Sequence, residues 1–484
     1  MAEAALPIPV EARVPQLKRS LGLTDVALFY VIAGSNLQWV ATAANAGPSS
    51  LPLWIGGCAV MFLPLALVVI VLSSRYPDEG GMYIWSKRAF GPFAGFMTGW
   101  TYWTSNLPYF PALLYFTAGN ALFISGGSGG TLATSAPYFI IVSIAGLLFG
   151  TIVNVLGLDV GKWLNNAGAI SRWSVTLLLI GLGALAWSRF GPATHVDVQT
   201  MRPGFQLKDI IFWSVIVFAW TGPESLPLMA GEVKNPRRII PLGLLIAAPA
   251  IAVIYIAGTV AVLAALTPSA VNTTAGVMQA IARVANATGW NALTPFAALL
   301  VTVSCLGSVG AWLAAVARIP FVAGIDRYLP KAFGRIDPRW GSPVVALVTQ
   351  AAISAIFIFL GQGGASVRSA YNTLVSSTVI ITLIPFLFLF ASALVLRQDP
   401  RQRNALRLPG GQLTVALAAC VGLAVTLFAI VLGFFPADTE PDKLGAVLRV
   451  VGLTVLMVGS GVVVYLIGSR RARRALRCNL IRIL

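Results

Sequence analysis

The chain has 484 residues, of which only 10% are charged and 57% are hydrophobic. Soluble globular proteins carry about 25% charged residues, and so few charges would leave a soluble domain with a largely apolar surface. The composition therefore excludes a soluble enzyme, a disordered protein and a coiled coil, and predicts an all-α integral membrane protein. The net charge of +17 has two explanations, a nucleic-acid surface or basic loops on one side of a membrane.

Apolar stretches long enough to cross a bilayer recur along the whole chain. We predict about twelve spans, near residues 25–45, 51–74, 93–122, 137–156, 166–187, 209–230, 241–266, 293–321, 343–361, 371–396, 412–434 and 446–468. Little sequence is left for a soluble domain.

The basic residues separate into two groups once these spans are placed. With the N-terminus in the cytoplasm, 26 of the 33 Lys and Arg residues fall on the cytoplasmic side and 7 outside. This asymmetry is the positive-inside signal of membrane proteins. It predicts that both termini are cytoplasmic, and the expected location is the plasma (inner) membrane. The basic run from Arg470 to Arg477 follows an apolar span, so we interpret it as an anchor facing anionic lipid rather than as a nucleic-acid patch.

Helix breakers interrupt two of the predicted spans at corresponding positions. The first span contains Ala33-Gly34-Ser35-Asn36, and the sixth contains Trp220-Thr221-Gly222-Pro223-Glu224. The two interrupted spans are five helices apart, so the sixth span crosses the membrane in the opposite direction to the first. This arrangement is typical of inverted-repeat secondary transporters. The alternative is a pair of tolerated kinks, because Gly and Pro are common in membrane helices.

The predicted organisation follows from this pairing of spans. It comprises a cytoplasmic N-terminal segment 1–23, a first repeat 24–187 and a second repeat 208–397, followed by two spans in 411–468 and a basic cytoplasmic tail 469–484.

Glu224 is the one carboxylate that falls deep within a predicted span. A charge there costs at least ~3 kcal/mol, so the side chain must face protein or water. Glu224 is therefore a candidate for proton coupling or gating. The alternative is a structural role, as an acceptor for amides freed by the break at Gly222-Pro223.

Interrupted helices also indicate what could bind between them. Free N–H groups and a partial positive charge at a half-helix N-terminus suit a carboxylate, and the carbonyl ends of the opposing halves suit an ammonium group. Together they describe a site for a zwitterionic α-amino acid.

Four motifs carry a family resemblance. They are Glu79-Gly80-Gly81-Met82-Tyr83-Ile84-Trp85, the stretch Gly231-Glu232-Val233-Lys234-Asn235-Pro236-Arg237-Arg238 after the sixth span, Cys305 to Trp312 in the eighth span, and Asp326-Arg327-Tyr328-Leu329-Pro330. With them the chain resembles the amino acid–polyamine–organocation (APC) superfamily of permeases. The resemblance implies a LeuT-type fold of five plus five inverted helices, with helices 1 and 6 broken, and transport of amino acids or related compounds.

The resemblance also implies site residues by position. Phe218 matches a gating aromatic residue, Ala219 and Trp220 would offer backbone carbonyls to a substrate ammonium, and Ser308 and Trp312 match substrate-lining positions. Tyr102 and Asn106 are four residues apart and so share a helix face, and the resemblance implies that this face looks into the same cavity. For each aromatic residue the alternative is ordinary packing or a place in an interfacial aromatic belt. The complete predicted substrate-binding set is Ala33, Gly34, Ser35, Asn36, Tyr102, Asn106, Phe218, Ala219, Trp220, Gly222, Ser308 and Trp312.

The chain departs from the family pattern in the first span. Relatives usually have a Gly-Ser-Gly break there, whereas this sequence reads Ala33-Gly34-Ser35-Asn36-Leu37-Gln38.

The coupling ion is open. Some relatives replace a coupling sodium with a lysine on helix five, and Arg172 lies about one turn from that position. Arg172 is therefore a possible cation-site surrogate. We favour the other interpretation, a side chain that snorkels to the cytoplasmic surface.

These observations favour a secondary active transporter of amino acids that works by alternating access, as a proton symporter or an exchanger. A transporter of polyamines or other organic amines with the same fold is the nearest alternative. A membrane-embedded enzyme is disfavoured because it would need further catalytic groups beside Glu224. A channel or receptor is disfavoured because repeated broken helices with an acid in one of them favour a transporter. We expect no enzymatic activity, cofactor, metal or nucleic-acid partner. The expected partners are a small amino acid or amine, the lipid bilayer, and a proton or sodium ion. The oligomeric state stays open.

Overall fold

The computed structural model describes residues 17–127, 130–361, 367–399, 406, 408–435 and 443–483, and these are almost entirely helical. The elements in chain order are α1 Leu23–Gly34, α2 Leu37–Ala46, α3 Ser50–Gly57, the π-helical η1 Cys58–Phe62, α4 Leu63–Arg75, α5 Met82–Phe90, α6 Pro92–Ala121, the 3₁₀ turns η2 Leu122–Ser125 and η3 Gly130–Thr134, α7 Ala136–Val155, α8 Leu158–Phe190, α9 Leu207–Ala219, the 3₁₀ turn η4 Leu226–Glu232, α10 Pro236–Ala265, η5 Pro268–Ala270, α11 Gly276–Thr288, α12 Leu293–Ile325, α13 Val344–Gly361, α14 Val367–Leu396, α15 Gly411–Gly433 and α16 Lys443–Ile483.

The helices match the spans of a multi-pass membrane protein. Within the described residues, ten helical segments are long and apolar enough to cross a bilayer. The predicted ninth span corresponds to a shorter apolar helix, Val344–Leu360, and the predicted sixth is divided between α9 and η4. The count of twelve remains a prediction.

The first and sixth spans are interrupted where the sequence has helix breakers. Ser35 and Asn36 are extended and separate α1 from α2. α9 ends at Ala219, and the chain then passes through Gly222, whose φ of +134° is readily adopted only by glycine. Pro223 follows and has no N–H with which to continue a helix. The second interruption therefore has a local cause in the sequence, and the first coincides with the predicted Gly34-Ser35-Asn36 break.

Long helices surround these two interruptions. α1 packs against α8 and α10, and α6 packs against α12 and α14. α8 and α12 come especially close at Gly168 and Gly307, where a Cβ atom on either glycine would lie 2.7 Å from the other's Cα. This close approach brings the middle of α8 against α12 beside the interruption of the first span.

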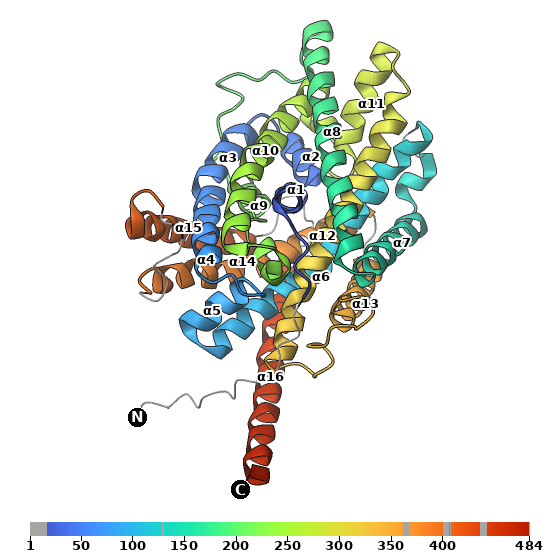
Figure 1. Cartoon of the computed structure of the whole chain (residues 1–484). Helices are drawn as coiled ribbons and strands as arrows, with labels where there is room; N and C mark the ends of the chain where they lie inside the picture. The colour runs from blue at the N-terminus through green and yellow to red at the C-terminus, as the bar shows by residue number, and fades with distance from the viewer. Residues whose placement is uncertain are drawn as a thin grey trace.

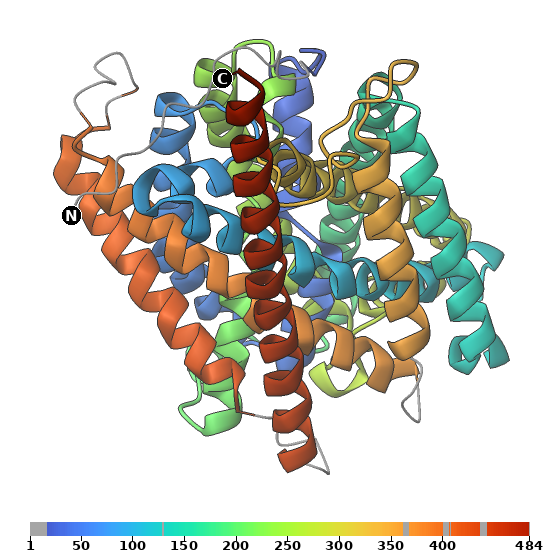
Figure 2. The ribbon, with the colours of Figure 1, turned by 90° about the horizontal axis from the view of Figure 1, so that it is seen from below.

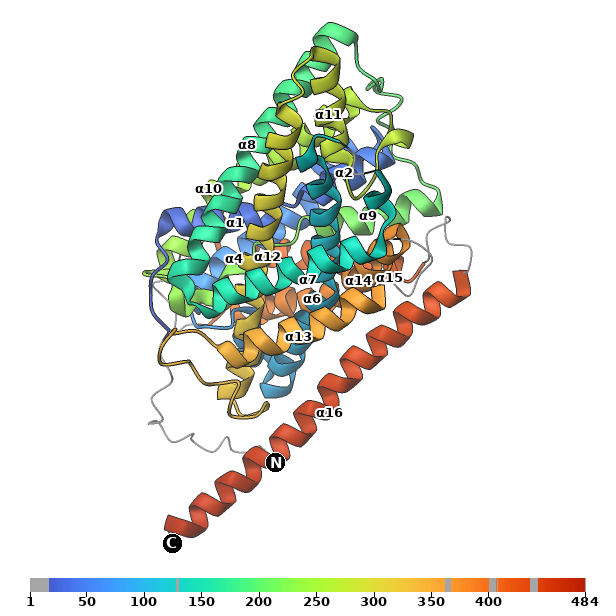
Figure 3. The ribbon, with the colours of Figure 1, turned by 90° about the vertical axis from the view of Figure 1, so that its right-hand side faces the viewer.

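The two ends of the molecule carry different segments. Figure 1 shows α5 and the C-terminal end of α16 at the lower end, and α11 at the upper end. The charge distribution predicts these segments on opposite sides of the membrane, with the lower end cytoplasmic. α15 lies at the edge of the helical body in Figure 2, and α16 lies on its outside in Figure 3. Only 17% of the apolar window within Val451–Arg471 is buried.

Several helices differ from the sequence-based spans. α5 and α11 were not predicted, α8 begins eight residues before the predicted 166–187 span, and α16 continues to Ile483 where a separate tail was expected. Hydropathy detects only the part of a helix that is apolar, whereas backbone hydrogen bonding continues through polar ends and amphipathic turns.

Candidate functional site

The interruptions of the two spans meet at one place. A Cβ atom on Gly222 would lie 2.6 Å from the Cα of Gly34, so glycine at position 222 allows the two backbones to touch. Tyr255 on α10 joins them, because its hydroxyl lies 2.9 Å from the Ala219 carbonyl, 3.3 Å from the Gly34 carbonyl and 3.2 Å from the Asn36 N–H, which donates to it. The carbonyl of Ala219, which the resemblance assigned to a substrate ammonium, is therefore bonded to Tyr255 in this structure.

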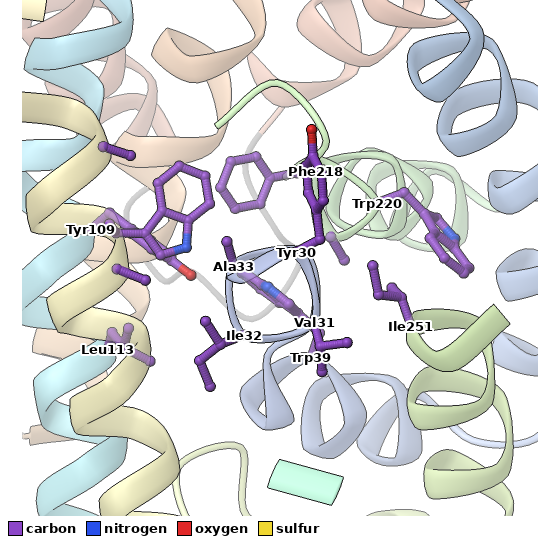
Figure 4. Close-up of a cluster of buried hydrophobic side chains, with 14 of the residues drawn as sticks. Tyr30, Val31, Ile32, Ala33, Trp39, Tyr109, Leu113, Phe218, Trp220 and Ile251 are labelled. Carbon is purple, nitrogen blue, oxygen red and sulfur yellow. The ribbon is translucent and has the colours of Figure 1, made fainter. Parts of the chain in front are cut away.

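A cavity lies beside this junction and encloses about 340 Å³, including the space at its open side. Its lining residues come from the two interrupted spans and from α6, α12 and α14. They are Ala33, Asn36, Trp39, Asn106, Tyr109, Phe218, Ala219, Thr221, Trp312, Thr378 and Thr382. Figure 4 shows several of these side chains gathered around the end of α1.

Aromatic rings form much of the cavity wall. The rings of Trp39 and Phe218 meet edge to face at 5.4 Å, and Tyr109 lies 6.3 Å from Phe218 and 6.0 Å from Trp312. Trp312 carries a buried indole N–H without a hydrogen-bond partner among the described residues. Much of the cavity wall is therefore apolar and aromatic.

Six residues of the predicted binding set line this cavity: Ala33, Asn36, Asn106, Phe218, Ala219 and Trp312. The other six lie outside its lining and are Gly34, Ser35, Tyr102, Trp220, Gly222 and Ser308. Trp220, for example, faces Trp54: its indole N–H donates to the Trp54 carbonyl at 3.2 Å.

The sequence reasoning missed Trp39, Tyr109, Thr221, Thr378 and Thr382 in the lining. Helical spacing contained a signal for three of these positions. Tyr109 lies three residues after Asn106, and Thr378 and Thr382 are four residues apart, so each pair shares a helix face.

Glu224 is fully buried behind this lining and accepts two hydrogen bonds. Its Oε2 accepts from the Gly222 N–H at 2.7 Å, and its Oε1 accepts from the Tyr102 hydroxyl at 2.7 Å. One carboxylate oxygen thus binds an amide freed by the interruption, and the other binds α6. The carboxylate ties the sixth span to its neighbour.

Arg172 is also fully buried, so the expectation of a snorkelling side chain is wrong. Its Nε donates to the Ser304 hydroxyl at 2.7 Å, and its Nη2 donates to the Ser308 hydroxyl at 2.7 Å. A longer bond of 3.5 Å reaches the Asn36 Oδ1. α8 is longer than predicted at its N-terminal end, which places Arg172 well inside the helix and within reach of α12 rather than near the surface.

Asn36 connects this buried cation to the cavity. Its Oδ1 faces Arg172 and also accepts from Ser308 at 3.3 Å, while its Nδ2 donates to the Tyr109 hydroxyl at 2.9 Å. Ser308 lies within 3.1 Å of the Ile32 carbonyl at the end of α1. The oxygens of Asn36, Ser304 and Ser308 therefore surround one positive charge.

The chain is similar to known membrane transporters over most of its length. It is 29% identical to an uncharacterised transporter of Legionella pneumophila over 440 residues, covering 88% of this chain and 92% of that protein. It is 27% identical to an uncharacterised transporter of Mycobacterium tuberculosis, covering 85% and 87%. It is 22% identical to AguD of Lactococcus lactis, a probable agmatine/putrescine antiporter, covering 90% and 94%.

The fold is similar to that of a solved transporter structure. The crystal structure of MhsT in complex with L-phenylalanine matches with a TM-score of 0.62 at 14% identity, covering 86% of this chain and 99% of MhsT. This likeness confirms the predicted all-helical, LeuT-type fold. The family model described as amino acid permease matches residues 20–459. The chain is a multi-pass membrane transporter that belongs to the amino acid permease family of the APC superfamily.

Proposed function

We propose that this protein is a secondary active transporter that carries a neutral amino acid by alternating access. The observation that carries the proposal is the cavity itself, which lies where the interruptions of two membrane helices meet. Interruptions of this kind let two halves of a transporter move around a central site. A ligand in this position contacts α1, α6, α9, α12 and α14 together, which makes its binding sensitive to their relative movement.

The charges around the cavity favour an amino acid over a diamine. The described lining residues contain no Asp or Glu. Glu224 is the nearby acid, but both of its oxygens already accept hydrogen bonds. Arg172 adds a buried positive charge behind Asn36. A second ammonium group would therefore meet no free carboxylate, whereas the carboxylate of a zwitterion benefits from the neighbouring guanidinium.

An aromatic amine-binding site is the second candidate. Faces of Trp, Tyr and Phe rings attract cations, and the similarity to AguD adds weight to this class of substrate. Equilibrium counterflow in proteoliposomes separates the two. We expect exchange of at least one neutral amino acid and no exchange of putrescine or agmatine. Exchange of the diamines alone would replace the proposal with the second candidate.

We further propose that Arg172 takes the place of a coupling cation. Hydroxyl, amide and carbonyl oxygens are the ligands that hard cations prefer, and here oxygens of Ser304, Ser308 and Asn36 bind the guanidinium. A permanent positive charge at this point makes sodium unnecessary. Transport should therefore be independent of sodium.

Glu224 is proposed as the gating acid. A protonated carboxyl can accept with one oxygen and donate with the other, so a change in protonation reverses the direction of its bond with Tyr102 while the bond from Gly222 is kept. Glu224→Gln keeps this donor–acceptor pattern permanently. We expect the variant to fold and to exchange substrate but to lose uptake driven by an imposed pH gradient. Unchanged proton-driven uptake in Glu224→Gln would leave Glu224 with the structural role alone.

A further inference from the structure

A second group of buried charges lies away from the cavity lining. It consists of Glu79 in the loop between α4 and α5, Glu232 at the end of η4, and Arg318 in α12, and we call it the charge cluster. The side chains of Glu79, Glu232 and Arg318 are only 16%, 2% and 4% exposed. Two of the three belong to motifs that carry the family resemblance, but the proposed function uses none of them.

The contacts within the charge cluster are unequal. Arg318 donates to the Glu232 Oε1 from Nη2 at 2.6 Å and from Nε at 3.0 Å. Its Nε lies 3.9 Å from the Glu79 Oε1, too far for a hydrogen bond. Glu79 instead accepts from the Gly231 N–H at 2.6 Å through Oε2. One oxygen of each acid, Oε1 of Glu79 and Oε2 of Glu232, is buried without a hydrogen-bond partner among the described residues.

The charges in this cluster do not balance. If both acids were ionised, two negative charges would share one guanidinium in a buried place, and an uncompensated buried charge is strongly destabilising. One proton removes the excess charge. It also supplies an O–H donor where two acceptor oxygens are now unpaired.

The other charged groups nearby are already paired or exposed. Asp326, at the end of α12, accepts from Lys87 at 2.6 Å and from the Tyr83 hydroxyl at 2.7 Å, both on α5. At the start of α10, Lys234, Arg237 and Arg238 are exposed, as are Lys18 and Arg19 before α1. Within the described part of the chain, Arg318 is the one cation found in an ion pair with either acid.

Burial raises the pKa of both carboxyl groups. It raises the pKa of Glu79 well above its ordinary value, the Glu232 carboxylate raises it further, and Arg318 and the Gly231 N–H oppose them. Burial also raises the pKa of Glu232, against the effect of Arg318. Proton binding is therefore favoured by the packed arrangement.

The charge cluster joins the segments that would separate if this end of the molecule opened. The Ser20 and Leu21 N–H groups, just before α1, donate to the Glu232 carbonyl at 2.9 and 3.1 Å. The Gly80 N–H, beside Glu79, donates to the Leu228 carbonyl at 3.0 Å. α1 and η4 are the halves of the two interrupted spans that lie toward this end, which the charge distribution predicts to be cytoplasmic.

We propose that Glu79 and Glu232 share a single proton in this packed arrangement, that Arg318 neutralises the remaining charge, and that loss of the proton opens this end of the transporter. Only the consequence for transport rests on the proposed function. The proton site itself stands on the contacts of the charge cluster.

The direction of the pH effect follows from linkage. Both carboxyl pKa values are raised in the packed form relative to an open form in which water reaches them. The stabilisation of the packed form is therefore complete below the ordinary carboxyl pKa, and it is lost as the pH rises through the raised values. Alkaline conditions on this side should favour opening.

The first test detects the proton directly, by infrared titration of the full chain in lipid. Glu224→Gln serves as the background because it removes Glu224, a deeply buried acid outside the charge cluster. We expect a protonated carboxyl C=O band at neutral pH in this background. Adding Glu79→Gln or Glu232→Gln should each remove it, since one acid then pairs with one arginine. Adding Asp326→Asn, which changes a paired acid outside the cluster, should leave it. Absence of the band in the background, or its persistence in both double variants, would overturn the shared proton.

The second test measures opening. A single cysteine replaces the fully buried Met229 in η4, in a chain whose native cysteines are replaced by serine. Labelling by a water-soluble maleimide is compared with and without Glu79→Gln, so that the pH dependence of thiol reactivity cancels. We divide the labelling rate of the chain with native Glu79 by the rate of the Glu79→Gln variant. We expect this ratio to rise at least tenfold with pH. A constant ratio would contradict the opening step. Neither measurement needs a transported substrate. A failure to carry amino acids would therefore contradict the proposed function without bearing on the shared proton or the opening.

Discussion

Two buried ionisable side chains flank the cavity without lining it. Arg172 donates to oxygens on the first span and on α12, whereas Glu224 accepts from the sixth span and from α6. Each charge is therefore held by partners on two elements that an alternating-access movement would displace. At the residue scale, these two side chains and the glycine at the junction are where single changes should matter most.

Arg172→Gln should reduce transport by at least tenfold. The variant removes a buried charge and leaves hydroxyl groups of Ser304 and Ser308 without their donor, and each unmet buried group costs about 1–3 kcal/mol. Arg189→Gln changes an exposed arginine at the C-terminal end of α8 and should have little effect. Initial uptake rates are measured in sodium and in choline. Wild-type uptake that required sodium would contradict the assignment of Arg172 as a cation surrogate.

Gly222→Ala should abolish transport or prevent folding. Alanine is strained at a φ of +134°, at a cost of about 1–3 kcal/mol, and its Cβ would meet the backbone of Gly34. Gly181→Ala is the matched control, because a Cβ there meets nothing within 4 Å. Thermal unfolding in detergent and counterflow are measured for both. Normal activity of Gly222→Ala would mean that the two interruptions do not have to touch.

At the scale of elements, the interruptions of the two spans behave as one unit because α10 joins them. The Tyr255 hydroxyl bonds to backbone atoms of both. α8 and α12 meet through facing glycines, which positions Arg172. The cavity is thus built by contacts between elements far apart in the sequence.

Tyr255→Phe should weaken this junction while leaving the aromatic packing of the ring against Trp54 intact. Each lost hydrogen bond is worth about 0.5–1.5 kcal/mol, so we expect a lower unfolding temperature and slower counterflow. Tyr138→Phe removes a comparable bond from a tyrosine hydroxyl to the Ala118 carbonyl, outside the cavity lining, and should lower stability without slowing counterflow. Equal slowing in both variants would argue against a special role for the junction.

The sequence predicted most of this architecture because membrane spans and helix breakers have local signatures. Gly34, Gly222 and Pro223 mark the interruptions through backbone chemistry that is visible in one short stretch. Tyr255 has no such signature, because its role depends on which backbone atoms lie opposite α10. The burial of Arg172 was missed for a similar reason. Hydropathy places an arginine at a helix end unless its partners on another helix are known.

At the scale of the whole molecule, the amino acid permease fold places a cavity near one junction and a charge cluster toward one end. The interrupted spans connect the two sites, since α1 and η4 run from the junction toward the cluster. If the proposed opening of the charge cluster takes place, it would therefore also displace residues at the edge of the cavity. Under that proposal, the arrangement would link binding in the middle of the protein to access from one end.

Equilibrium counterflow of radiolabelled amino acids, putrescine and agmatine in proteoliposomes decides whether the protein carries amino acids through this cavity. The proposed function predicts that at least one neutral amino acid exchanges, that the exchange is unchanged when choline replaces sodium, and that the diamines do not exchange. Counterflow of putrescine or agmatine without any amino acid, or no counterflow of any of these compounds by a correctly folded protein, would contradict it.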